Sequence, residues 1–128
     1  MKNLNTEHIL SALSYLSFFV FPVFAPLIFI IVFRKSKFIL FHSIQAFFIQ
    51  LIFYIIAMEL LTNKEYILNY LINNGNFDLL MILCAIYVYG FFISLLFGAY
   101  KASGGKWFKF PIIGNIAERI VKLLLVES

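Results

Sequence analysis

Hydrophobic residues along the chain gather in three long runs that short polar stretches separate. The runs cover residues 9–33, 38–61 and 79–100. The hydrocarbon core of a bilayer is about 30 Å thick, and ~20 helical residues at a rise of about 1.5 Å per residue cross it. Each run exceeds that length, so the pattern predicts three transmembrane helices.

The polar stretch between the second and third runs carries a helical pattern of its own. Tyr66, Ile67, Tyr70 and Leu71 recur at helical spacing, and Gly75 follows as a plausible helix stop. We therefore expect a short helix here, lying on the outer membrane surface.

The segment that follows the third run also has a helical pattern. Gly104 and Gly105 end the third run, and Pro111 suits the first turn of a new helix. Residues 111–126 then place apolar side chains on one face and charged side chains on the other. This predicts an amphipathic helix at the inner surface, too short and too charged to cross the membrane.

Composition supports a membrane protein. Of 128 residues, 63% are hydrophobic and only 12% are charged, and the mean hydropathy is +0.98. Soluble domains have about 45–50% apolar and about 25% charged residues. We therefore predict an all-α integral membrane protein in which residues 1–128 form a single membrane domain.

The positions of basic residues predict the orientation. Between the second and third runs, residues 62–78 contain one basic residue, Lys64, and the acidic residues Glu65 and Asp78. Because positively charged loops stay in the cytoplasm, we expect a multi-pass membrane protein with the N-terminus outside and the C-terminus cytoplasmic. The net charge of +4 then indicates contact with the lipid bilayer, with no role for nucleic acid. The other basic residues that set this orientation are Arg34, Lys35, Lys37, Lys101, Lys106, Lys109, Arg119 and Lys122.

Small residues and prolines give two further structural predictions. Gly90, Ser94 and Gly98 form a helix-packing stripe on the third run, against a helix of the same chain or of another copy. Pro22 and Pro26 predict a kink in the first run. A packing kink and the broken helix of a transport site both remain open for these prolines.

Three polar residues in the second run form a candidate site. His42, Gln45 and Gln50 lie on or beside one face of the predicted helix. Polar side chains inside a membrane usually face a partner group or water. They act either as interhelical hydrogen-bonding groups or as contacts to a substrate or partner.

The sequence does not predict catalysis. Ser11, Ser14 and Ser17 have no histidine–carboxylate pair to activate them, and His8 and His42 are expected on opposite sides of the membrane. Cys84 is the only cysteine. We therefore expect no enzyme activity, no metal site and no cofactor.

Two stretches, "FILFHSIQAFF" and "AYKASGGKWFKFPIIGNIAERI", carry a resemblance to a known family. They resemble signatures of small prokaryotic membrane proteins similar to the twenty-kilodalton subunit of the chloroplast inner-envelope protein translocon. A related, largely uncharacterised bacterial and archaeal group shares them. The resemblance covers residues 13–121 and implies motif positions at His42, Gln45, Ala46, Lys101, Gly105, Lys106, Phe110, Pro111, Ile113 and Gly114.

This resemblance implies a protein of the prokaryotic cell membrane that is a subunit or accessory of a membrane transport system for proteins or peptides. Its expected partners are further copies of the chain or other membrane subunits, and a translocating polypeptide. The chloroplast member is described with four spanning helices, whereas only three runs occur here. A non-transport interaction protein, such as an immunity or membrane-stress factor, is the alternative.

The two signatures also lead to a structural hypothesis. Both fall at the inner side of the predicted topology. We expect His42 and Gln45 to hydrogen-bond the irregular backbone between Gly104 and Pro111, which would tie the C-terminal helix to the bundle.

Overall fold

The structure is a computed structural model that describes residues 2–127. The described residues form helices, turns and connections, without strands. The elements in chain order are α1 (Lys2–Leu16), the 3₁₀ helix η1 (Ser17–Phe19), α2 (Phe24–Val32), α3 (Lys37–Thr62), α4 (Lys64–Asn73), α5 (Phe77–Ser103) and α6 (Ile113–Glu127).

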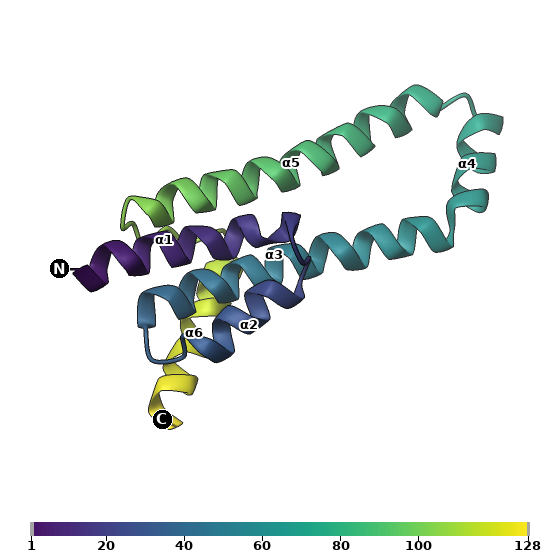
Figure 1. Ribbon diagram of the computed structural model, residues 1–128. Coiled ribbons are helices and arrows are strands. Elements are labelled where there is room, and N and C mark those ends of the chain that lie inside the picture. The colour runs from purple at the N-terminus through teal and green to yellow at the C-terminus, as the bar shows by residue number, and fades with distance from the viewer. Residues whose placement is uncertain (1, 128) are drawn as a thin grey trace.

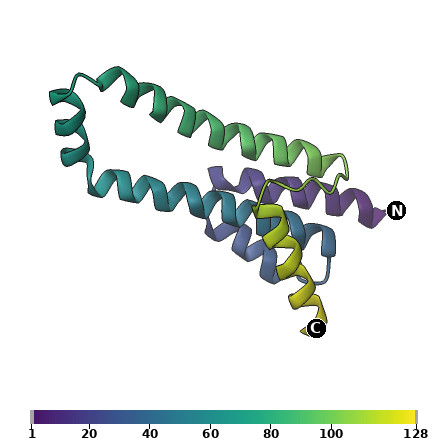
Figure 2. The ribbon, with the colours of Figure 1, turned by 180° about the vertical axis from the view of Figure 1, so that it is seen from behind.

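Two long helices, α3 and α5, define the shape of the molecule (Figure 1). α4 joins them at one end, which we call the distal end. At the other end, called the basal end, α3 begins at Lys37 and α5 finishes at Ser103. α1, α2 and α6 gather around the basal halves of the two long helices, and Figure 2 shows the same arrangement from behind.

α3 and α5 are two candidate membrane-spanning helices. They contain 26 and 27 residues, and their most apolar windows have mean hydropathies of 2.0 and 2.5. Two of the three predicted spans are therefore present as long apolar helices. A third span is not shown, because residues 9–33 do not form one continuous helix.

The first hydrophobic run instead reverses direction. α1 and η1 run from the basal end toward the middle of α3, and α2 returns toward the start of α3 (Figure 1). Pro22 lies in the break, where its missing N–H and its ring prevent a helix from continuing. Val23 has a φ of +68°, a strained conformation for a β-branched residue. The predicted kink at Pro22 is thus a reversal that turns α1 and α2 into a hairpin.

Pro26 has a different position from Pro22. It is the third residue of α2 and is buried. The N–H groups of the first helical turn have no partner within the helix, so a proline is tolerated there. Pro26 therefore fits the start of α2 and does not kink a longer helix.

The hairpin changes the expected position of the N-terminus. The Ser36 hydroxyl donates a hydrogen bond of 2.9 Å to Glu7 Oε1. The first turns of α1 therefore lie beside the start of α3, at the basal end. The prediction that the N-terminus and the loop before α3 lie on opposite sides of the membrane is not confirmed.

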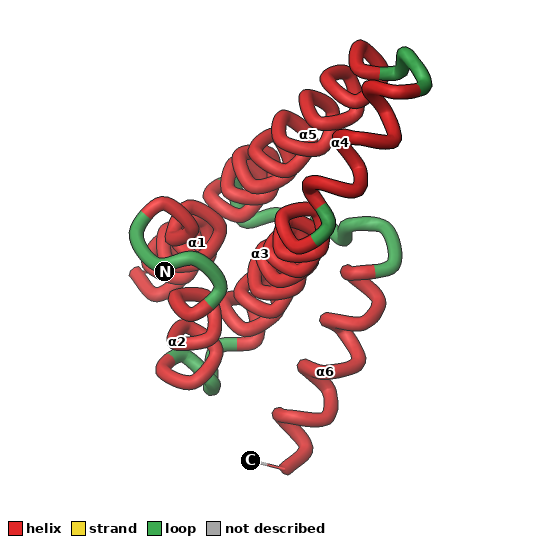
Figure 3. Tube along the Cα trace, turned by 90° about the vertical axis from the view of Figure 1, so that its right-hand side faces the viewer, coloured by secondary structure: helices red, strands yellow, loops and turns green. Residues whose placement is uncertain are grey.

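Both shorter predicted helices are present. α4 lies at the distal end, and its residues are exposed apart from the half-buried Ile67 and Leu71. α6 begins at Ile113, two residues later than expected, because Ile112 has a φ of +66° and interrupts the helix. In Figure 3, α6 lies beside α3 on the side away from α1 and α2. Its apolar face packs on α3 through the buried residues Leu40, Phe41, Ile44, Ala117 and Val121.

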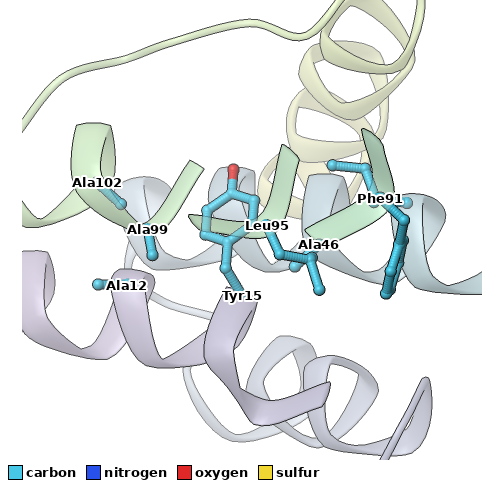
Figure 4. Packing of buried hydrophobic residues seen from close by; sticks show 8 residues of the cluster. Ala12, Tyr15, Ala46, Phe91, Leu95, Ala99 and Ala102 are labelled. Atoms are coloured by element: carbon cyan, nitrogen blue, oxygen red, sulfur yellow. The ribbon is translucent and has the colours of Figure 1, made fainter. Parts of the chain in front are cut away.

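The main apolar core lies where α1, α3 and α5 meet (Figure 4). Four of its eight members are alanines, which let the three helix backbones approach closely. The buried residues of this core are Ala12, Tyr15, Ala46, Ile49, Phe91, Leu95, Ala99 and Ala102.

The predicted stripe on α5 has two different surroundings. A Cβ at Gly98 would lie 2.6 Å from the ring of Tyr15, so this part of the stripe packs against α1 of the same chain. A Cβ at Gly90 would meet nothing within 4 Å. The Ser94 hydroxyl donates to the Gly90 carbonyl at 2.7 Å, within its own helix. Of the two glycines in the stripe, Gly98 is a close contact between helices of this chain and Gly90 is not.

Candidate functional site

Tyr15, His42 and Gln45 form a buried hydrogen-bonded network at the basal end. Each of the three side chains has a relative exposure of 0%. The Tyr15 hydroxyl lies 2.9 Å from His42 Nδ1, and Gln45 Nε2 donates to the Tyr15 oxygen at 3.1 Å. The network thus joins α1 to α3.

His42 and Gln45 also bind the backbone that connects α5 to α6. His42 Nε2 lies 2.9 Å from the Lys106 carbonyl oxygen. Gln45 Nε2 donates to the Phe108 carbonyl at 2.9 Å, and Gln45 Oε1 accepts from the Phe110 N–H at 2.9 Å. These are the hydrogen bonds that the sequence hypothesis expected. The backbone polar groups of alternate residues in the connection, Lys106, Phe108 and Phe110, therefore point toward α3, as they would along one edge of an extended strand.

The proton positions in the network follow from its partners. A carbonyl oxygen only accepts, so His42 Nε2 must carry the hydrogen and donate to Lys106. In neutral histidine, Nδ1 is then an acceptor, and the Tyr15 hydroxyl donates to it. The Tyr15 oxygen in turn accepts from Gln45. Each polar atom of the Tyr15, His42 and Gln45 side chains therefore has at least one hydrogen-bond partner within the chain.

Two glycines allow the connection to lie this close to the bundle. Gly105 has a φ of +76°, and a Cβ there would lie 2.6 Å from the ring of His8. At Gly114, a Cβ would lie 2.5 Å from the Cβ of Lys109 and 3.1 Å from Gln45 Oε1. Larger residues at either position would push the connection away from its hydrogen-bonding partners.

Gln50 binds a different part of the chain. Its Oε1 accepts from the N–H of Val23 at 2.9 Å, and its Nε2 lies 3.5 Å from the Ser14 carbonyl. An unpaired backbone N–H is costly inside a membrane. Gln50 therefore satisfies the backbone at the break of the hairpin, and it holds the hairpin against the middle of α3.

The remaining motif residues have separate surroundings. Lys101 Nζ lies 5.4 Å above the ring of Phe97, and the Lys106 side chain is exposed. Phe110 packs against the main core, while Pro111 is exposed and precedes α6. The motif residues of the α5–α6 connection therefore contribute backbone hydrogen-bonding groups and packing contacts, and their side chains do not form a reactive cluster.

Sequence reasoning missed Tyr15 and misplaced His8. Tyrosine in an apolar run is compatible with plain burial, so no signal marked Tyr15 as the donor to His42. His8 was expected across the membrane from His42. Its ring centroid in fact lies 5.2 Å from that of Phe38, whose centroid is 4.6 Å from that of His42. Among the described residues, no group of three or more His, Cys, Asp or Glu side chains could hold a metal ion.

A family model decides the relationship of this chain to other proteins. The magnetosome magnetite crystal formation protein family, MamF/MmsF, matches residues 6–117. The chain belongs to this family. The match runs from the first turns of α1 into α6, so this MamF/MmsF member carries the whole Tyr15–His42–Gln45 network within the matched region. Neither a curated protein nor a solved structure matches the chain.

The family match corrects the functional expectations. The resemblance to the chloroplast protein translocon subunit and its prokaryotic relatives is wrong, and with it the role in protein or peptide transport. The alternative of an immunity or membrane-stress factor has no support either. Both signature stretches overlap the region that matches the MamF/MmsF family, so in this chain they do not indicate a transport protein.

Proposed function

We propose that this chain is a membrane-embedded structural protein that takes part in magnetite crystal formation and does not itself catalyse a reaction. The match to the MamF/MmsF family over residues 6–117 carries this proposal. The matched region contains most of α1, the hairpin, both candidate spans, the connection to α6 and the first turn of α6. The family model thus matches most of the packed helical unit, and not an isolated motif.

The geometry suggests how such a protein would act. The polar groups of Tyr15, His42 and Gln45 all bond within the chain, so their role is to fix positions. They hold the connection after α5 against α3, and α6 consequently has one defined place on the basal end. In this proposal the chain presents α6 and the basal surface in a fixed arrangement within the membrane.

The charge distribution supports a specific orientation. All basic residues except Lys64 belong to segments at the basal end, and the distal segment 59–78 carries Glu59, Glu65 and Asp78. The side with more Lys and Arg stays cytoplasmic. We therefore propose that both termini are cytoplasmic, that α3 and α5 are the two spans, and that the α1–α2 hairpin enters the membrane from the cytoplasmic side without crossing it.

Complementation tests the proposed function. The chain would be produced in a magnetite-forming bacterium whose own family member has been deleted, and crystal size would be measured by electron microscopy. We expect crystals to recover toward their normal size. The variant H42L/Q45L removes the bonds to the connection and should restore size less well, whereas the exposed α4 variant N69A/N73A should behave like the unchanged chain. A chain that reaches the membrane at normal levels and leaves crystal size unaltered would refute the proposal.

A further inference from the structure

A cavity lies at the basal end, between the start of α3, the α5–α6 connection and α6. Its volume is about 240 Å³. Three lysines from these three segments line it, and they are not part of the Tyr15–His42–Gln45 network. The lining residues are Lys37, Phe41, Trp107, Lys109, Glu118, Val121 and Lys122.

The cavity carries excess positive charge. Glu118 is the one carboxylate in its lining. Its Oε2 pairs with Lys109 Nζ, and its Oε1 lies 3.6 Å from Lys122 Nζ. One carboxylate compensates one of the three lysines, which leaves a formal charge of +2 (three minus one). An anion with at least one negative charge fits this lining, and a cation does not.

The position of the cavity indicates where that anion comes from. Lys37 is the first residue of α3, so the cavity lies where a candidate span leaves the bilayer. This is the level of lipid headgroups, and basic pockets between helices at this level bind anionic headgroups. Phe41 and Val121 are buried and supply apolar walls, which suit the glycerol and upper acyl part of a lipid.

Trp107 marks the same level. Its ring centroid lies 5.0 Å from that of Phe38 and 5.4 Å from that of Phe41, while 49% of the residue remains exposed. Tryptophan partly packed and partly exposed is typical of the membrane interface. We propose that this cavity binds the phosphate group of an anionic phospholipid, with Lys37, Lys109 and Lys122 around the phosphate and Trp107 beside the glycerol.

The chain offers a direct probe, since Trp107 is its only tryptophan. Purified full-length protein in phosphatidylcholine nanodiscs would be compared at increasing mole fractions of phosphatidylglycerol, with bromine on the acyl chains of one lipid at a time. Bromine quenches tryptophan fluorescence at short range. We expect brominated phosphatidylglycerol to quench Trp107 at a much lower mole fraction than brominated phosphatidylcholine does.

Two matched variants separate the cavity from general surface charge. K37Q/K122Q removes two lining charges and leaves the Lys109–Glu118 pair in place. At about 1 kcal/mol for each basic residue, the preference for phosphatidylglycerol should fall about 30-fold. K35Q/R119Q removes two charges from neighbouring positions that do not line the cavity, and it should keep the preference.

Each outcome bears on the proposal. Equal loss in the two variants would mean general attraction to an anionic surface and would overturn it. Competition by soluble glycerol phosphate or inorganic phosphate would instead indicate a free phosphate site, and it would overturn the lipid assignment. Equal quenching by the two brominated lipids would also overturn it, and that comparison uses the unchanged protein and so needs no variant to fold. The measurement does not depend on magnetite formation, so its result is separate from the complementation result.

Discussion

Gly98 of α5 lies directly against the ring of Tyr15 of α1, and a Cβ at this position would come within 2.6 Å of that ring. Because Tyr15 also donates to His42, the glycine determines where the donor of the buried network lies. Close packing and hydrogen bonding at the basal end therefore depend on one another. A methyl group at position 98 has to displace the Tyr15 ring or the whole of α1.

The first prediction uses this contact. G98A should destabilise the protein by about 1–3 kcal/mol, the usual cost of overpacking a close-packed core. G90A is the matched control, because a Cβ there meets nothing within 4 Å and alanine favours a helix over glycine by about 1 kcal/mol. Denaturant titration in detergent, followed by circular dichroism, measures both. Equal stability of the two variants would show that Gly98 is not a close contact.

The second prediction concerns the Tyr15 hydroxyl. Y15F keeps the ring but leaves His42 Nδ1 without its donor and Gln45 Nε2 without one of its two acceptors. Leaving buried polar groups unpaired costs about 1–3 kcal/mol, although interhelical bonds in membranes average about 0.6 kcal/mol, so we expect a loss near 1 kcal/mol. Y100F, at an exposed position of α5, should be neutral in the same titration. A Y15F protein as stable as Y100F would argue against the network as a source of stability.

The apolar pattern predicted where helices occur because hydrophobic periodicity reports burial in lipid or protein. α3, α5, α4 and α6 follow from it within a few residues. The expectation that His42 and Gln45 bond the backbone between Gly104 and Pro111 came from the two signature stretches and the predicted topology, and it did not specify the individual pairs of atoms. Local sequence also indicates that a helix stops at Pro22. It does not indicate where the chain goes next, because a span and a hairpin bury the same apolar residues.

The hairpin and the network depend on contacts between distant segments. Gln50 binds Val23, which is 27 residues earlier in the chain, and Gln45 binds Phe110, which is 65 residues later. No local pattern fixes such pairs. The residue patterns did not identify the family either. The two signature stretches suggested a transport protein, whereas the family match over residues 6–117 shows that the chain belongs to MamF/MmsF.

The third prediction concerns pH and the attachment of α6. The Lys109 ammonium group donates a hydrogen bond to the Glu118 carboxylate, and Lys122 lies close to the same carboxylate. These two positive charges hold the pKa of Glu118 below its usual value of 4.5. A lowered pKa in the folded state means that the pair stabilises the fold at pH values above the unfolded pKa. This contribution is lost as the pH falls through the folded pKa.

Stability measured between pH 6 and pH 3 tests this expectation. The unchanged protein should lose stability relative to E118Q below about pH 4.5, and the difference between them should stay constant between pH 5.5 and pH 7. E65Q, which changes an exposed carboxylate at the start of α4, is the control and should follow the unchanged protein. A difference between E118Q and the unchanged protein that persisted at pH 3 would contradict the predicted linkage.

The last prediction separates a hairpin from a third span. In a C84S background the chain has no cysteine, so single cysteines can be introduced at Asn3, Asn74 and Ser103 and treated with a membrane-impermeant maleimide in intact spheroplasts. If α1 and α2 form a hairpin, positions 3 and 103 lie on the same side, and only the cysteine at 74 should react before the membrane is opened. Three spans would place position 3 with position 74, and both would react. The 2.9 Å bond between Ser36 and Glu7 favours the first result, because it joins the start of α1 to the start of α3.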